Sequence, residues 1–266
     1  DTKLVHFIGK DNIVFHCIIF PSMLEAHGDF VLPENVPANE FLNIEGQKVS
    51  TSRNWAVWVD EYLKDFPGQQ DVLRYVLCAN APETKDNDFT WKDFQDRNNS
   101  ELVSIFGNFV NRTFVLMHKL CNGKVPKLHE DIMDDTDHKM ITEFSNTKTK
   151  VENLLEQYKF RDALYEVIDL ARKGNKYMQD KQPWIVAKQT SEEGQLTTDA
   201  QAKVDNCLHI CLQLCANLAV FINPFLPFTA QKMIHMMKVV EKMLDWENAG
   251  KAKHLSVGYS LRAQEL

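Results

Sequence analysis

The spacing of hydrophobic residues changes near residue 90 of the chain. Close to its start, an almost continuous apolar run, Leu4–Ile8, stops at Gly9, and a second short apolar segment covers Glu40–Glu45. Runs of this kind are typical of strands buried in a parallel sheet. We therefore expect two strands with a helix over Ile13–Leu24 between them, and the prolines at positions 33 and 37 predict a loop before the second strand.

Helical spacing dominates the rest of the chain. Two amphipathic helices are expected over Trp55–Leu63 and Gln69–Ala79, and no strand is expected after residue 90. A broad apolar stripe predicts one long helix over Phe94–Leu120, with Gly123 as a left-handed C-cap. After an acidic linker at 125–137, a bundle is completed by helices over His138–Tyr158, Phe160–Met178, Thr197–Ile222 and Phe225–Leu244.

These two patterns predict an α/β region followed by a mainly α-helical region. The sequence Ala81-Pro82-Glu83 breaks the helical pattern and marks the expected boundary. We therefore divide the chain into an α/β domain at residues 1–82, a helical domain at 83–247 and an irregular tail at 248–266.

The composition is that of a globular protein that can bury a sizeable core. Of the 266 residues, 44% are hydrophobic and 25% are charged, and the formal net charge is −7. This acidic balance argues against a general electrostatic coat for nucleic acid, so DNA is not an expected partner, although a local basic patch is compatible with it. The longest apolar runs contain polar breaks, so no membrane span is expected.

Three of the six cysteines, Cys207, Cys211 and Cys215, recur every fourth residue within an apolar run. One helix face could offer these thiols to a metal ion, but free cysteines more commonly act as small buried hydrophobic residues. We therefore expect a core stripe and no metal site. The lack of a C-x-x-C pair favours a reduced, intracellular protein.

The segment from Gly46 to Arg53 contains a concentrated set of polar side chains. It offers one cation and three hydroxyls in close succession, at Lys48, Ser50, Thr51 and Ser52. A cation, hydroxyls and backbone N–H groups near a helix start suit a phosphate. On local chemistry alone, the favoured interpretation is a polar loop that caps the next helix through Ser52 or Asn54.

Three residues of the helical region suggest contacts with unpaired bases. Asn108 and Arg112 are four residues apart, so they share one face of the long helix. Trp184 follows Pro183, which favours the first turn of a new helix. Asn and Arg can pair with base edges, and a tryptophan can stack on a base. The alternatives are a solvated helix face and a tryptophan packed into the bundle.

Taken in order, these segments resemble the methionyl-tRNA synthetases, which are class I aminoacyl-tRNA synthetases. The stretch His6-Phe7-Ile8-Gly9-Lys10-Asp11, followed by Phe15-His16 and Pro21-Ser22-Met23-Leu24, is similar to the family's H-F-I-G-K-D…F-H…P-A-M-L. Lys48-Val49-Ser50-Thr51-Ser52 is similar to its K-M-S-K-S loop. Asn108 and Arg112 match its anticodon-helix pattern N-x-x-x-R, and Lys181-Gln182-Pro183-Trp184 matches its K-x-P-W motif.

The resemblance implies a fold and a set of partners. Residues 1–82 would be the C-terminal half of a parallel, Rossmann-like nucleotide-binding sheet, and residues 83–247 an α-helical anticodon-binding bundle. The partners implied are ATP, with Mg²⁺ as its counter-ion, methionine and tRNA(Met). The implied location is the cytoplasm. The family's zinc site would lie in a segment N-terminal to this chain, and the sequence specifies no oligomeric state.

The resemblance also assigns roles to individual residues. ATP would be bound by Gly9, Asp11, Leu42, Lys48 and Arg53. Methionine would be bound by Phe15 and His16, the catalytic loop would act through Lys48, Ser50 and Ser52, and the CAU anticodon would be read by Asn108, Arg112 and Trp184. Lys48 would stabilise the charge on the ATP phosphates as the adenylate forms.

Two departures from the family pattern change these expectations. The second lysine of the family's loop is Thr51 here, and Arg53 is the candidate for the missing cation. The H-I-G-H motif of the family does not occur in the 266 residues, and the tail resembles a link to a further appendage. We therefore expect a chain truncated at both ends that does not activate methionine alone. The alternative is a stand-alone tRNA-binding module of synthetase origin without catalysis.

Overall fold

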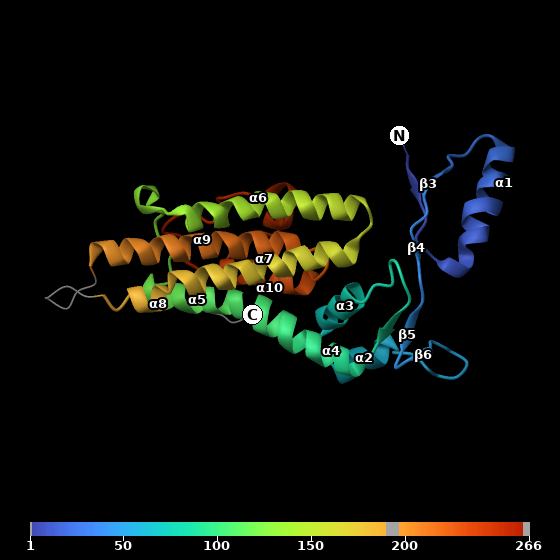
Figure 1. Cartoon of the computed structure of the whole chain (residues 1–266), viewed down its shortest axis with the longest axis horizontal. Helices are drawn as coiled ribbons and strands as arrows, with labels where there is room; N and C mark the ends of the chain where they lie inside the picture. The colour runs from blue at the N-terminus through green and yellow to red at the C-terminus, as the bar shows by residue number, and fades with distance from the viewer. Residues whose placement is uncertain (1, 190–196, 263–266) are drawn as a thin grey trace.

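A computed structural model describes residues 2–189 and 197–262 of the chain. The short strands and helix α1 lie at one end of an elongated molecule, and the long helices lie side by side at the other end (Figure 1). Helices α2, α3 and α4 lie between these two parts. The α/β region therefore precedes a helical bundle, as the hydrophobic pattern predicts.

The first strands form two parallel pairs. Strand β1 (Leu4–Val5) pairs with β3 (Pro33–Asn35), and β2 (Ile8–Gly9) pairs with β4 (Ala38–Asn39). The parallel direction is as expected, but the loop predicted around the prolines is wrong, because two strands form there. Pro33 is the first residue of its strand, where its missing N–H costs least. The expected burial is also wrong, since Phe7, between β1 and β2, is 54% exposed.

A helical segment connects β2 to β3. It starts as a 3₁₀ turn (Lys10–Asn12), continues as the π-helix η2 (Phe15–Ile19) and becomes α1 (Phe20–His27). Gly28 ends α1 with φ +86°, a conformation that glycine adopts without strain. The helix expected over Ile13–Leu24 is thus confirmed, and its middle is wider than a regular α-helix.

A three-stranded sheet follows, with β5 (Leu42–Ile44) in its centre. Strand β6 (Gln47–Lys48) pairs with β5 in an antiparallel hairpin, and β7 (Asn87–Phe89) pairs with β5 in parallel. Strand β7 was not expected. It follows residue 82 in sequence and still completes this sheet, so the exact boundary between the two domains stays a prediction.

The segment after the hairpin contradicts one expectation. Helix α2 covers Val59–Asp65, and Trp58 is its N-cap residue, so the helix does not start at Trp55. Backbone hydrogen bonds between Ser50 and Trp55 close a turn instead. Neither Ser52 nor Asn54 caps a helix, and the helix-capping interpretation of this loop is therefore wrong. Helix α3 follows at Gln70–Ala79.

One continuous helical rod forms where a single long helix was expected. It consists of α4 (Trp91–Arg97), the π-helix η3 (Asn98–Gly107) and α5 (Asn108–Leu120). The Thr90 side chain accepts a hydrogen bond from the Asp93 N–H and caps its start. Gly123 has φ +70°, which confirms the left-handed residue at its end.

The remaining helices surround α9. A capping box between Asp134 and Asp137 starts α6, so the helix begins inside the expected linker. Gly174 of α7 lies so close to Phe109 and Leu214 that an added Cβ would clash with both side chains. The helices of this part are α6 (Asp135–Glu156), α7 (Phe160–Lys181), α8 (Pro183–Val186), α9 (Thr198–Ile222) and α10 (Pro227–Met237).

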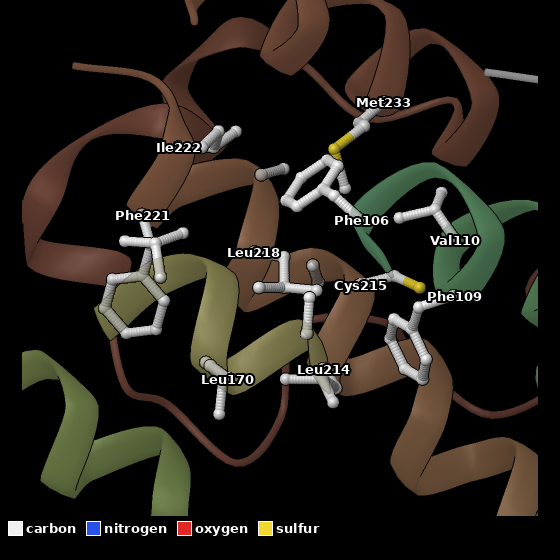
Figure 2. Close-up of a cluster of buried hydrophobic side chains, with 14 of the residues drawn as sticks. Phe106, Phe109, Val110, Leu170, Leu214, Cys215, Leu218, Phe221, Ile222 and Met233 are labelled. Atoms are coloured by element: carbon white, nitrogen blue, oxygen red, sulfur yellow. The ribbon is translucent and has the colours of Figure 1, made fainter. Parts of the chain in front are cut away.

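Helix α9 is the centre of the hydrophobic core. Its side chains contact those of α5, α7 and α10, as the cluster around Leu214, Cys215 and Leu218 illustrates (Figure 2). Cys207, Cys211 and Cys215 are all buried, which confirms the expected core stripe. Helix α9 is long and apolar enough to cross a membrane, but 94% of its most apolar window is buried inside the bundle.

Helix α3 joins the two parts of the molecule. The Arg74 guanidinium donates hydrogen bonds to the carbonyl oxygens of Phe225 (2.7 Å) and Pro224 (3.3 Å) in the turn between α9 and α10. The Asp71 carboxylate accepts a hydrogen bond of 2.6 Å from the Thr229 N–H in the first turn of α10. A carboxylate at a helix N-terminus is favourable, so this contact fixes α10 against α3.

Candidate functional sites

The first candidate site brings the 3₁₀ turn after β2 and the hairpin strand β6 together around Phe41. The ammonium groups of Lys10 and Lys48 lie 4.5 and 5.5 Å from the centre of the Phe41 ring. Lys10 also forms ion pairs with Glu40 and Asp86, whose hydrogen bonds raise the pKa of Lys10. Lys48 has no carboxylate partner among the described residues, so its charge remains available to an anion.

Gly9 and Asp11 lie in the same area, where β2 ends. An added Cβ on Gly9 would lie 2.7 Å from Oδ1 of Asp11, so the two residues are in close contact. Asp11 is exposed and belongs to the 3₁₀ turn. Ligands bind at this edge of parallel α/β sheets. Leu42 is half-buried in the neighbouring sheet, on β5.

Phe15 and His16 are the first two residues of the π-helix η2. The Phe15 ring is 59% exposed, whereas Nδ1 of His16 lies 3.4 Å from Nδ1 of His6. π-Helices are rare and frequently occur at functional sites. The structure therefore places both residues at a local irregularity, with His16 held by a partner from the first strand segment.

The loop from Lys48 to Arg53 differs from the arrangement that its sequence suggested. The hydroxyl oxygens of Ser50 and Ser52 are 3.2 Å apart, and both Thr51 and Arg53 are exposed. Helix α2 begins only at Val59, so the loop does not present a helix N-terminus to a phosphate. Any phosphate contact must come from the loop's own side chains and N–H groups.

The second candidate site lies where α5 meets α7 and α8. The Arg112 guanidinium lies over the Trp184 ring, 4.3 Å from its centre, and donates a hydrogen bond of 3.4 Å to Oε1 of Gln179. One turn earlier on α5, the Asn108 amide donates a hydrogen bond of 3.1 Å to Oδ1 of Asn175. The structure thus brings Asn108, Arg112 and Trp184 to one surface.

Trp184 occupies the position that the proline predicts. Pro183 is buried at the start of α8, and Gln182 before it adopts a left-handed conformation with φ 45°, so the chain turns sharply after α7. The Trp184 side chain is half-buried and packs against the hydrophobic core. The ring is thus anchored in the bundle, as the packing interpretation predicts, while the stacking of Trp184 on a base stays a prediction.

Charged groups hold the end of α7 that leads into Trp184. The Lys181 ammonium lies 2.8 Å from Oδ2 of Asp134 and 2.7 Å from Oδ1 of the buried Asp137. Burial opposes ionisation of Asp134, but hydrogen bonds from Lys181 and Thr136 lower the pKa of its carboxyl well below the usual range. The Tyr177 hydroxyl donates a further hydrogen bond to Asp137. These contacts connect α7 to the start of α6.

Sequence reasoning missed the supporting residues of both sites. Lys10 lies inside the H-F-I-G-K-D stretch, but the resemblance assigns no role to it, and Asn175 and Gln179 match none of the family motifs named above. Their spacing of four residues repeats that of Asn108 and Arg112, which is the one signal that was available. In residues 2–189 and 197–262, no three His, Cys, Asp or Glu side chains lie close enough to hold a metal ion.

Comparison with known families matches both parts of the chain. The family described as class I tRNA synthetases (M) matches residues 1–114, and the anticodon-binding domain of methionyl-tRNA ligase matches residues 125–266. The chain belongs to the methionyl-tRNA synthetase family. Its two-part architecture, a Rossmann-like α/β portion followed by a helical bundle, is the family's fold.

Individual relatives support this membership. The chain is 56% identical over its whole length to the methionine–tRNA ligases of Phocaeicola vulgatus and Bacteroides fragilis, and it spans 37% of the length of each. A solved structure of Mycobacterium tuberculosis methionyl-tRNA synthetase, in complex with methionyl-adenylate, matches 97% of the chain with a TM-score of 0.86 and 25% identity. The match covers 48% of that synthetase.

Proposed function

We propose that this chain is part of a methionine–tRNA ligase, which activates methionine with ATP and transfers it to tRNA(Met) in the cytoplasm. The observation that carries the proposal is the surface formed by Asn108, Arg112 and Trp184. A guanidinium over an indole ring, beside an exposed amide, offers both stacking and hydrogen bonding to splayed bases. The helical domain would read the CAU anticodon with these three residues.

We assign nucleotide binding to the area around Phe41. Lys48, which has no carboxylate partner in the described part of the chain, would bind the ATP phosphates, and Ser50 and Ser52 would donate hydrogen bonds to them. Gly9, Asp11 and Leu42 would contact the nucleoside, and Arg53 would supply the cation that Thr51 lacks. Preorganised charges of this kind stabilise the developing transition state without a covalent step, and Mg²⁺ would accompany the ATP.

Methionine would contact Phe15 and His16 on η2. An exposed aromatic ring suits the apolar thioether, for which contacts with aromatic rings are favourable. The edge-to-face contact with the His6 ring would fix the orientation of the His16 imidazole. The zinc site of the family is proposed to lie outside this chain.

We further propose that the 266-residue chain alone does not activate methionine. The first buried hydrophobic residue in the described chain is Tyr62, so the candidate ATP and methionine residues lie on segments without a core of their own. The test is methionine-dependent ATP–pyrophosphate exchange by the purified chain. A rate above the blank would contradict the proposal, whereas tRNA binding without exchange would fit a stand-alone tRNA-binding module as well.

The anticodon role is tested by Trp184→Ala in the full-length protein. Loss of one stacking platform costs roughly 1–3 kcal/mol, so tRNA binding should weaken about fivefold to 150-fold while ATP–pyrophosphate exchange stays unchanged. Tyr165→Ala is the matched control, because this aromatic residue of α7 is 61% exposed and is not part of the proposed surface. Equal losses of binding and exchange in Trp184→Ala would reject the assignment.

A further inference from the structure

Helices α5 and α7 contact each other through two matched side-chain pairs. Asn108 pairs with Asn175, and one turn further along both helices Arg112 pairs with Gln179. Only Asn108 and Arg112 match a family motif, so the partners on α7 carry no assigned role. The pair formed by Asn108 and Asn175 is the more informative, because both side chains are amides whose two ends have opposite hydrogen-bonding character.

The orientation of the Asn175 amide is fixed by backbone carbonyls. Its Nδ2 lies 2.8 Å from the carbonyl oxygen of Ile105 and 3.3 Å from that of Ala171. A carbonyl oxygen can only accept a hydrogen bond, so the NH₂ group of Asn175 must face these two atoms. Its Oδ1 is therefore directed to Asn108. Rotating this amide by half a turn would place its oxygen against two carbonyl oxygens.

The fixed Asn175 amide determines how Asn108 presents its own amide. Oδ1 of Asn175 can only accept, so Asn108 must direct its NH₂ group to it, at 3.1 Å. This leaves Oδ1 of Asn108 and one N–H available to a ligand, and no described residue pairs with that oxygen. Asn108 is exposed, so the oxygen can meet an incoming base.

The identity of the base that fits follows from this orientation. At one place on the pairing edge, cytosine carries an amino donor where uracil carries a carbonyl acceptor. Adenine and guanine differ in the same way. An asparagine that can rotate its amide by half a turn accommodates either member of each couple. One whose oxygen and remaining N–H are both held in place fits only the base with an amino donor opposite the oxygen and a ring acceptor opposite the N–H, namely cytosine or adenine.

We propose that Asn175 is a positioning residue that locks the Asn108 amide and so makes it select an amino base over the corresponding keto base. The inference rests on the proposed function, in which Asn108 contacts the anticodon CAU, whose first two bases are amino bases. Ile105, which accepts from Asn175, belongs to the π-helix η3 that ends directly before Asn108. Asn175 therefore contacts the helical turn from which Asn108 extends.

The test measures the affinity of the full-length protein for three anticodon stem–loop RNAs with the anticodons CAU, UAU and CGU. The wild type is expected to prefer CAU over the keto variant at the base that Asn108 contacts. Asn175→Ala should lower that preference about tenfold, the size of one lost discriminating contact. A structural defect alone would weaken all three RNAs by the same factor and leave the ratio unchanged.

A double mutant separates the positioning role from other effects. If Asn175 acts only through Asn108, then Asn175→Ala has no further effect on the ratio in an Asn108→Ala background. Asn153→Ala, an exposed amide on α6, is the matched control and should keep the wild-type ratio. Asn175→Ser replaces the alanine variant if that variant does not fold, and the same change in ratio is expected.

The outcomes distinguish this inference from the proposed function. A wild-type preference for CAU that Asn108→Ala reduces and Asn175→Ala does not would overturn the positioning role and leave the anticodon role intact. A wild type that binds all three RNAs equally would overturn the proposed function itself. A lowered ratio in Asn175→Ala that vanishes in the Asn108→Ala background supports the inference.

Discussion

The helical bundle and the first sixty or so residues bury their hydrophobic side chains to very different extents. From Val204 to Ile222 almost every side chain of α9 is buried, whereas no hydrophobic residue before Tyr62 is buried in the described chain. Exposed apolar side chains such as Phe15, Ile18 and Met23 cover the π-helix and α1 instead. The two parts therefore depend on different sources of stability.

This contrast shows how each part carries its candidate site. In the bundle, the groups proposed to read the anticodon extend from helices whose opposite faces form a common core. In the α/β part, the groups proposed to bind ATP and methionine sit on short strands and turns joined by a few contacts around Phe41. Clustered exposed apolar residues mark surfaces that pack against other groups. We expect the α/β site to need such contacts to become active.

The largest expected effect is on the free energy of unfolding. Leu218→Ala should lower the free energy of unfolding by about 2–5 kcal/mol, because it leaves a cavity in the bundle core. Ile18→Ala should change it by less than about 0.5 kcal/mol, since Ile18 is 60% exposed. Urea unfolding of the chain followed by circular dichroism measures both values. Similar losses in the two variants would mean that the two parts are equally well packed.

The next effect concerns the α/β site alone. Lys48→Ala in the full-length protein should slow ATP–pyrophosphate exchange about a hundredfold or more, the usual cost of removing one preorganised charge at a phosphoryl centre. Affinity for tRNA should stay the same, because the lysine is remote in sequence from the bundle residues. Lys64→Ala on α2, whose side chain is 74% exposed, is the control. An unchanged exchange rate in Lys48→Ala would remove the loop from the reaction.

A smaller effect is expected at the anticodon surface. Arg112→Lys keeps the positive charge but loses the flat guanidinium that lies over Trp184. The tRNA affinity should fall by about 1 kcal/mol, or roughly fivefold, with adenylate formation unaffected. Filter binding and pyrophosphate exchange of the same preparation test both statements. Full affinity in the lysine variant would show that charge alone matters at this position.

The smallest effect is a pH dependence of the bundle's stability. Burial, with a smaller contribution from the Lys251 charge, lowers the pKa of His254 from 6.5 to about 4. The unfolded chain therefore binds more protons between these values, so stability is full above about pH 6.5 and falls as the pH decreases to about 4. Solvent screening keeps the slope below about 1 kcal/mol per pH unit.

His254→Gln should flatten this part of the stability curve. His138→Gln on the exposed side of α6 provides the control and should retain the wild-type slope. The measurement is the free energy of unfolding at a series of pH values. An identical slope in wild type and His254→Gln would assign the acid sensitivity to other groups.

The helices of the bundle could be predicted from the sequence because their apolar residues follow the helical period. The stripe that includes Phe106, Phe109 and Val110 is buried as expected. The start of α2 could not be predicted in this way, since Trp55 and Val59 have helical spacing although only Val59 is helical. The indole N–H of Trp55 donates to the Ile44 carbonyl, a tertiary contact that holds it in the preceding turn.

The short strands could not be predicted from the sequence for a different reason. Strands β3, β4 and β7 contain proline, glutamate, asparagine and aspartate, and none has an alternating apolar pattern. Their pairing partners decide their conformation, and pairing is not visible in a local pattern. The same limit applies to the sites. The shared face of Asn108 and Arg112 follows from spacing, but the contact with Asn175 depends on how α7 docks.

The proposed anticodon surface is tested most directly by the affinity of the full-length protein for an anticodon stem–loop RNA. The CAU loop and an otherwise identical loop with three other anticodon bases are compared in wild type and in Trp184→Ala. We expect the wild type to bind CAU about a hundredfold more tightly, as two or more base contacts of 1–3 kcal/mol each imply. Trp184→Ala removes the ring on which the Arg112 guanidinium lies, so this difference should become smaller. Equal binding of both loops by the wild type would contradict the proposed anticodon surface.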